Sequence, residues 1–121
     1  MKKIVLILIS FTIFSCKNEV QKTENSISSV ASLEKGQQLF QENNCAACHQ
    51  TNQKVVGPSL KQIAKIYKEQ NASLKNFLKA ESKPIIDPLQ YETMKINLET
   101  TKGMTDEELN SLEIYIYSFS K

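Results

Sequence analysis

The sequence is poor in several residue types on which common functions depend. Its 121 residues include no tryptophan, one histidine, and no arginine among the fifteen basic residues. Because nucleic-acid-binding domains present clusters or stripes of Lys and Arg, the lack of such a stripe disfavours binding to DNA or RNA. With a single histidine, the sequence indicates no pairing of a nucleophile with a base. We therefore expect neither a nucleic-acid-binding protein nor an enzyme.

Material for a hydrophobic core is also scarce. Aromatic side chains make up 7% of the residues, and the length favours a single domain. Small domains bury a modest fraction of their surface and often need a disulfide, a metal or another covalent link for stability. The fold is therefore expected to depend on such a link.

The first sixteen residues are typical of an export signal. Lys2 and Lys3 precede an apolar run over 4–14, and the segment ends in Ser15-Cys16. The run is too short to span a bilayer, whose core needs about 20 apolar residues. A small residue before a cysteine resembles the lipobox of bacterial lipoproteins, so 1–15 is predicted to be a signal peptide and Cys16 the lipidated residue. An ordinary secretory signal with an incidental cysteine is the alternative, and both export the protein.

The next segment, 17–31, is polar and is predicted to be a flexible tether after the lipidated Cys16. It has too few apolar residues to fold alone. A flexible chain of fifteen residues has an r.m.s. reach of roughly 20 Å, so the domain over 32–121 is expected close to the membrane surface. Once Lys2 and Lys3 are removed, 13 lysines balance 13 acidic residues.

Residues 32–121 carry helical signals, and no alternating strand pattern competes with them. Ser32 is expected to cap a first helix that runs to about Asn43, with Leu33, Gly36 and Phe40 on one face. Capping patterns and prolines mark later helix starts at Ser59 with Gln62, Asp87 with Pro88, and Thr105 with Glu108. The predicted helices follow Pro58, lie near 73–80, form a short turn over 89–93, and run from Thr105 to the C-terminus. The predicted fold class is all-α, with four to five short helices.

The chemistry is concentrated at Cys45-Ala46-Ala47-Cys48-His49, directly after the first expected helix. The spacing C-x-x-C-H is the attachment pattern of c-type haem. Two thiols three residues apart on a tight helical turn can each reach one vinyl group of the same porphyrin, and the adjacent imidazole then lies over the iron. The motif predicts one covalently attached haem c, with Cys45 and Cys48 as thioethers and His49 as an iron ligand.

Three other interpretations explain less of this motif. A structural zinc site needs four ligands, and only Cys45, Cys48 and His49 remain once Cys16 is assigned to lipid. A thioredoxin-like redox pair needs a βαβ setting that the helical signals do not supply. A disulfide between Cys45 and Cys48 suits an oxidising compartment, but it gives no reason for a histidine directly afterwards.

Over 32–121 the sequence resembles the class I cytochrome c family in its small bacterial form. The likeness rests on an ordered set: a helix with Gly36 and Phe40, the C-x-x-C-H motif, Gly57-Pro58, a later methionine and an aromatic C-terminal helix. It implies the cytochrome c fold, in which short helices surround one covalently attached haem.

The same resemblance implies two contacts. Gly36 would let the first helix approach the last one closely, against Tyr115 or Ile116. The Pro58 carbonyl would accept a hydrogen bond from His49 Nδ1, which orients the ring and leaves Nε2 for iron.

The resemblance also requires a methionine as the second iron ligand, and two lie downstream. Met104 directly precedes the last helix, where it has the spacing of a hydrophobic staple with Leu109 and thus a structural role. Met94 instead precedes an expected open stretch, in which Asn97 could donate a hydrogen bond near the sulfur. Met94 is therefore the predicted ligand, and a core methionine packed beside Tyr91 is the alternative.

An iron held by His49 and Met94 has no open site for substrate, so the resemblance implies electron transfer between redox partner proteins. We expect a monomer that is exported and anchored to a bacterial membrane through Cys16, facing the periplasm or cell envelope. Lys54 and Lys61 are either solvated or ring the haem edge. The alternative functions are a ligand sensor or peroxidase-like protein with an open sixth iron position, and a membrane-tethered binding module without haem.

Overall fold

The computed structural model describes residues 19–121, with side chains from Ser28 onward. The predicted signal peptide and Cys16 lie outside the described residues. Five α-helices and two 3-10 helices follow in chain order: α1 (Glu19–Glu42), η1 (Cys45–Ala47), α2 (Leu60–Glu69), α3 (Leu74–Leu78), η2 (Pro88–Gln90), α4 (Tyr91–Lys102) and α5 (Asp106–Tyr117). Within this part of the chain there is no strand, and a single isolated bridge joins His49 to Lys54. The all-α prediction is confirmed.

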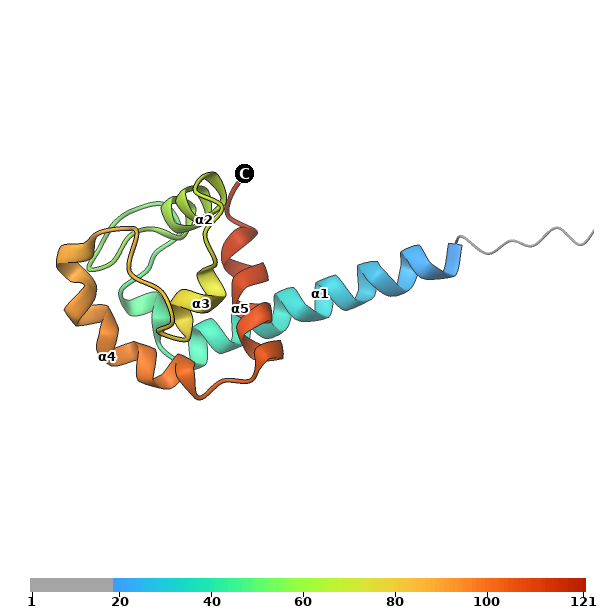
Figure 1. The fold of residues 1–121 in the computed structure, drawn as a ribbon. Helices are drawn as coiled ribbons and strands as arrows, with labels where there is room; N and C mark the ends of the chain where they lie inside the picture. Colours follow the sequence, from blue (N-terminus) through green and yellow to red (C-terminus); the bar gives the residue numbers. More distant parts are fainter. Residues whose placement is uncertain (1–18) are drawn as a thin grey trace, which may run out of the picture.

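Helices α1 and α5 make the most extensive contact between elements. They cross near the C-terminal half of α1, and α2, α3 and α4 lie on one side of this crossing (Figure 1). A Cβ atom on Gly36 would lie 2.0 Å from the Ser111 carbonyl oxygen and 2.8 Å from Tyr115 Cβ, so only glycine fits there. The predicted close approach of Gly36 to the last helix at Tyr115 is confirmed, and the nearest atoms belong to the Ser111 backbone.

A single core joins the helices. Its buried members come from α1, α2, α3 and α5 and are Leu39, Phe40, Leu60, Ile63, Ala64, Tyr67, Leu74, Leu78, Leu109, Leu112 and Ile116. Capping side chains set where the helices begin. The Ser59 hydroxyl accepts a hydrogen bond from the Gln62 backbone amide, and Thr105 and Glu108 form a reciprocal capping box. The predicted starts of α2 and α5 are confirmed.

The start of α1 differs from the sequence prediction. The helix begins at Glu19 instead of Ser32, and the Ser32 hydroxyl donates to the Ser28 carbonyl oxygen at 2.9 Å within the helix instead of capping it. Residues 19–31 are therefore helical where a flexible tether was expected. Once α5 holds the end of α1, each added residue orders one backbone unit and gains one hydrogen bond, so extension needs little further packing. The extended half projects away from the other helices (Figure 1).

The second difference lies at α4. Residues 94–97 belong to a twelve-residue helix, so the prediction of an open stretch after Met94 is wrong. Tertiary contacts explain the helix: Leu98 is fully buried, and the buried Thr101 hydroxyl donates to the Leu78 carbonyl oxygen at 2.6 Å. Asp87 does precede Pro88 at the start of η2, but its carboxylate makes no capping hydrogen bond.

Between residues 19 and 121, no helix combines the length and the apolar character that crossing a membrane requires.

Candidate functional site

The C-x-x-C-H residues form a tight turn between α1 and α2. Asn44, in the left-handed region at φ 55°, reverses the chain after α1, and the 3-10 turn η1 follows at once. The backbone amides of Cys48 and His49 both donate to the Cys45 carbonyl oxygen, at 3.2 and 3.0 Å. This turn brings the two thiols and the imidazole to the wall of one cavity.

The His49 ring is held from two directions. Its Nδ1 lies 2.8 Å from the Pro58 carbonyl oxygen, which only accepts hydrogen bonds, so Nδ1 carries the proton. Nε2 then keeps a free lone pair for a metal ion. On the adjacent side, a Cβ atom on Gly57 would lie 2.4 Å from His49 Cε1. Gly57 is therefore needed because the imidazole packs directly on its backbone.

Backbone hydrogen bonds fasten the segment between η1 and α2 at both ends. The Gly57 amide donates to the Cys48 carbonyl oxygen at 3.0 Å. The Leu60 amide donates to the Gln50 carbonyl oxygen at 2.9 Å, and Lys61 to Thr51 at 3.2 Å. The position of His49 is thus fixed mainly by the main chain.

The cavity beside this motif has about 1160 Å³ of space outside the protein atoms, including space that is open to solvent. Its walls are largely apolar and include Phe40, Leu60, Ile63, Leu74, Phe77, Leu78, Leu112 and Ile116. Such a cavity, with two thiols and an imidazole on one wall, fits a large, mostly apolar cofactor attached at that wall.

Opposite the motif, the walls come from η2 and α4. Met94 lines the cavity, whereas Met104 is absent from its lining and packs half-buried against the core. Asn97 also lines the cavity, but its side-chain amide donates to the Thr93 carbonyl oxygen at 3.4 Å within α4. The fold therefore brings His49 and Met94, but not Met104, to one cavity.

The donor set also bears on the other interpretations of the motif. Cys45 and Cys48 are free thiols in the structure. Burial raises the pKa of the Cys45 thiol, and the neighbouring Cys48 adds to the shift. Among residues 28–121, whose side chains the structure describes, no three His, Cys, Asp or Glu side chains are grouped to hold a metal ion.

Three aromatic rings, those of Tyr67, Phe77 and Tyr91, also line the cavity. The Tyr67 and Phe77 ring centroids are 6.2 Å apart, and those of Phe77 and Tyr91 are 6.3 Å apart. Burial, reinforced by the charge of Tyr117, raises the pKa of Tyr67 to about 12, so its hydroxyl stays neutral at physiological pH. No signal in the sequence indicated that Tyr67 would face the cavity.

An ion pair between Lys54 and Asp87 was not predicted. It joins the segment after the motif to the start of η2. Asp87 is in the left-handed region at φ 50°, and its position before Pro88 had indicated a helix cap. The sequence carries no signal of this ion pair, because the left-handed backbone at Asp87 is visible only in the structure.

The fold is small and all-α, and one wall of its apolar cavity carries paired thiols and a backbone-held imidazole. These features define a class of helical haem proteins. Residues 33–120 match the cytochrome c family, and the chain belongs to that family. Its cofactor is haem c, attached covalently, and Cys45 and Cys48 fit the attachment motif.

One relative is cytochrome c-552 from Nitrosomonas europaea. It is 54% identical to this chain over 33 residues, which make up 27% of this chain and 32% of the relative. The match therefore spans about a third of that protein's length. The likeness supports the family. It does not by itself show the activity of the whole protein.

Proposed function

We propose that this protein is an exported, lipid-anchored electron carrier whose haem iron is held by His49 and Met94. The observation that carries the proposal is that Cys45, Cys48, His49 and Met94 line a single cavity. A neutral imidazole with its free nitrogen available, and a thioether sulfur from another element, are the two ligand types found in carrier cytochromes c.

Each side chain has a separate task in this proposal. Cys45 and Cys48 form the thioether links, and His49, oriented by Pro58 and Gly57, supplies Nε2 to the metal. The apolar walls exclude water, and Met94 favours the reduced state relative to a second histidine. When bound, the haem iron supplies one-electron chemistry by alternating between its ferrous and ferric states.

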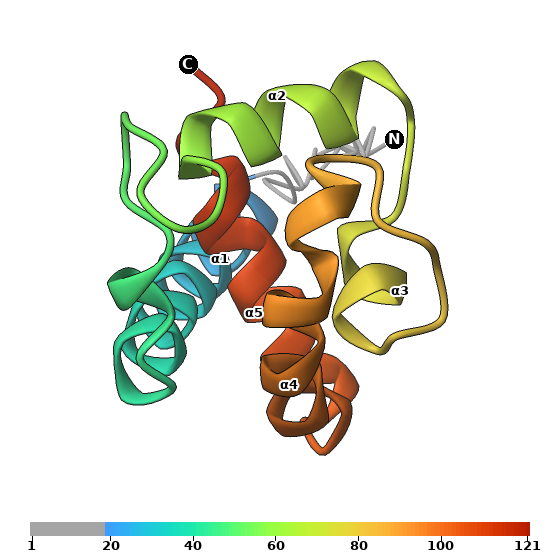
Figure 2. The same cartoon turned by 90° about the vertical axis from the view of Figure 1, so that its left-hand side faces the viewer.

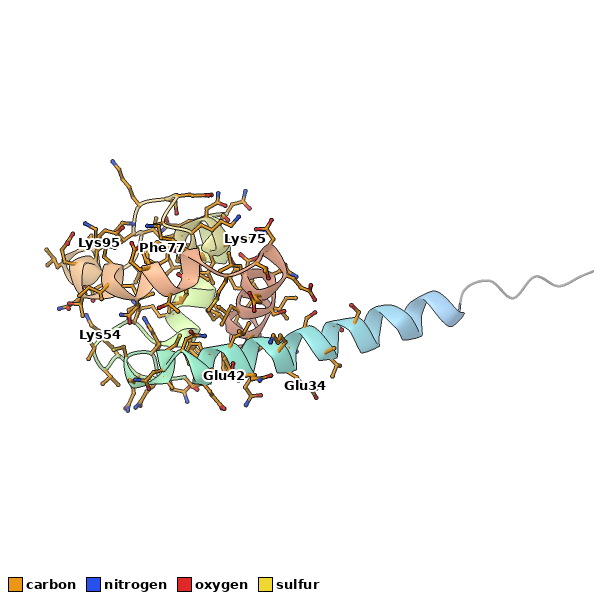
Figure 3. The ribbon with its side chains drawn as sticks, turned by 90° about the horizontal axis from the view of Figure 1, so that it is seen from below. Glu34, Glu42, Lys54, Lys75, Phe77 and Lys95 are labelled. Atoms are coloured by element: carbon orange, nitrogen blue, oxygen red, sulfur yellow. The ribbon has the colours of Figure 1, made fainter. Side chains whose placement is uncertain are left out.

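The shape of the chain suggests how the carrier is presented to a partner. Residues 19–31 of α1 rise about 20 Å at 1.5 Å per residue, so a helix would separate the domain from an anchor at Cys16. Lys54 and Lys95 lie at the end of the domain opposite the projecting half of α1 (Figure 3). An anchor beyond α1 would leave that end, which borders the cavity at Asp87, free to meet a redox partner.

Electron carriage is tested on the native protein purified from membranes. We expect the mass of one haem to remain attached after denaturation, and a reversible redox titration that fits one electron. A protein without attached haem would be the binding module considered above. A protein whose oxidised iron binds added ligands as readily as a Met94→Ala variant would have an open sixth position, as a sensor or peroxidase-like protein does.

Anchorage is tested separately with Cys16→Ser. The native protein should sediment with membranes, and the variant should be released into the soluble fraction while it keeps its haem spectrum. A haem-loaded Cys16→Ser protein that stays membrane-bound would show that lipidation at this residue is not the anchor.

A further inference from the structure

The ion pair of Lys54 and Asp87 joins two walls of the cavity that are 33 residues apart in sequence. Lys54 lies in the segment that also carries Val56, Gly57 and Pro58, and Asp87 starts η2, directly before α4. In Figure 2 this segment lies at the left, beside the start of α2, and α4 lies apart from it, below the other end of α2. The pair thus connects the side that holds His49 with the side that carries Met94.

The pair lies at the edge of the cavity. Asp87 lines the cavity with 20% of its side chain exposed, and the Lys54 side chain is 54% exposed. Asp87 is held in the left-handed region, which aspartate and asparagine tolerate better than most residues. An aspartate at this position combines that backbone with a carboxylate that reaches Lys54.

The first half of α4 has no buried side chain, and it meets α3 through the Tyr91 ring, whose centroid lies 6.3 Å from that of Phe77. The buried side chains of the helix, Leu98 and Thr101, belong to the second half. In the first half, Tyr91 and Met94 are half-buried, and Ile96 is 76% exposed. Leu89, in the preceding η2, is 92% exposed. The segment that positions Met94 therefore depends more than the rest of the helix on what holds its beginning.

We propose that Lys54 and Asp87 are positioning residues that hold Met94 on the iron, because their ion pair fixes the start of α4 to the His49 side of the cavity. The proposal rests on the proposed ligation by Met94. Loss of the pair increases the fraction of molecules in which Met94 has left the iron and an outside ligand can bind.

The test uses the oxidised full-length haem protein and imidazole, a ligand that competes with methionine, at a pH where imidazole is uncharged. Its apparent dissociation constant is inversely proportional to the open fraction, so a larger open fraction gives tighter binding. Asp87→Asn removes the charge but keeps a residue that tolerates the left-handed backbone, and Lys54→Gln removes the partner. Each should tighten imidazole binding about two- to fivefold, the ratio expected for a partly exposed ion pair.

The double variant should bind no more tightly than either single variant, because both remove the same interaction. Raising the salt concentration should tighten binding to the wild type but not to the variants, because salt screens the pair. The matched control is Glu92→Gln, which removes an exposed ion pair with Lys95 on the same helix and should leave the affinity unchanged. Amide hydrogen exchange at the start of α4 should accelerate in Asp87→Asn and not in Glu92→Gln.

The outcomes separate this proposal from the ligand assignment. If the wild-type protein lacks the methionine-to-iron charge-transfer band, the ligation by Met94 is wrong. If the band is present but Asp87→Asn and Lys54→Gln bind imidazole like the wild type, the ligation stands and the positioning role is overturned. Additive effects of the two single variants would also overturn it, because the residues would then act independently.

Discussion

The two sides of the cavity are built differently. On the His49 side, main-chain hydrogen bonds and glycine packing fix a short turn, and nearly every contact joins residues close in sequence. On the Met94 side, a helix is anchored at its far end by Leu98 and Thr101, and the ion pair of Lys54 and Asp87 lies before its beginning. Local sequence thus specifies the attachment side, whereas tertiary contacts position α4 and Met94.

The largest effects should follow from changes on the attachment side. His49→Ala removes the imidazole that Pro58 and Gly57 hold in place, and no other histidine exists to replace it. We expect the normal low-spin spectrum to be abolished. Cys45→Ala or Cys48→Ala should each lose one thioether and reduce the yield of mature protein, measured by mass and haem staining. A normal low-spin spectrum for the His49 variant would refute its role as a ligand.

The next largest effect is expected at Gly57, and Gly103 provides the matched control. In Gly57→Ala the new methyl group would press on the His49 ring, which should cost about 1–3 kcal/mol of unfolding free energy and alter the haem spectrum. In Gly103→Ala the new methyl would lie 3.5 Å from its nearest neighbour, an ordinary contact. That variant should be neutral or slightly stabilising, by up to about 1 kcal/mol. Denaturant unfolding of both haem proteins checks the difference, and equal losses would contradict the close packing at Gly57.

A change at the anchored end of α4 should affect only the Met94 side of the cavity. Thr101→Val keeps the shape but leaves the Leu78 carbonyl oxygen without this donor, at a cost of about 1–2 kcal/mol. Hydrogen exchange should accelerate along α4, while amides of the segment between η1 and α2 keep their protection. Equal acceleration in both segments would show that the two sides open as one unit.

The smallest effect concerns the ion pairs of Asp106 between α3 and α5. Hydrogen bonds from Lys79, at 2.6 Å, and then Lys75 lower the pKa of the Asp106 carboxyl, which links α3 to α5. Because the folded-state pKa is lowered, this contribution is present above the pKa of the unfolded chain, about 4, and is lost as the pH falls further. Asp106→Asn should therefore flatten the acid limb of the stability curve and change little at neutral pH. An unchanged acid limb would show that the carboxylate adds no stability.

The same contrast explains how far the sequence predicts this structure. The caps at Ser59 and Thr105 and the C-x-x-C-H turn depend on neighbours within a few residues, and each lies where the sequence predicts it. The hydrogen bond from His49 to Pro58 is the one that the family resemblance implies.

The errors fall where distant contacts decide. Residues 94–97 look like a loop because the burial of Leu98 and the bond from Thr101 to Leu78 cannot be inferred from neighbours. The helix over 19–31 extends a helix that α5 stabilises elsewhere, and Asp87 has the sequence of a cap but pairs with Lys54. For residues 94–97 and Asp87, a local propensity yields to a partner distant in sequence.

The most direct test of the account is to compare Met94→Ala with Met104→Ala in the oxidised haem protein. Met94 lines the cavity with His49, and Met104 packs against the core outside it. Met94→Ala should remove the methionine-to-iron charge-transfer band and lower the reduction potential. Met104→Ala should keep both and lose about 2–3 kcal/mol of stability at most, because its side chain is only half-buried. Loss of the band in Met104→Ala, with the band intact in Met94→Ala, would contradict the proposed site.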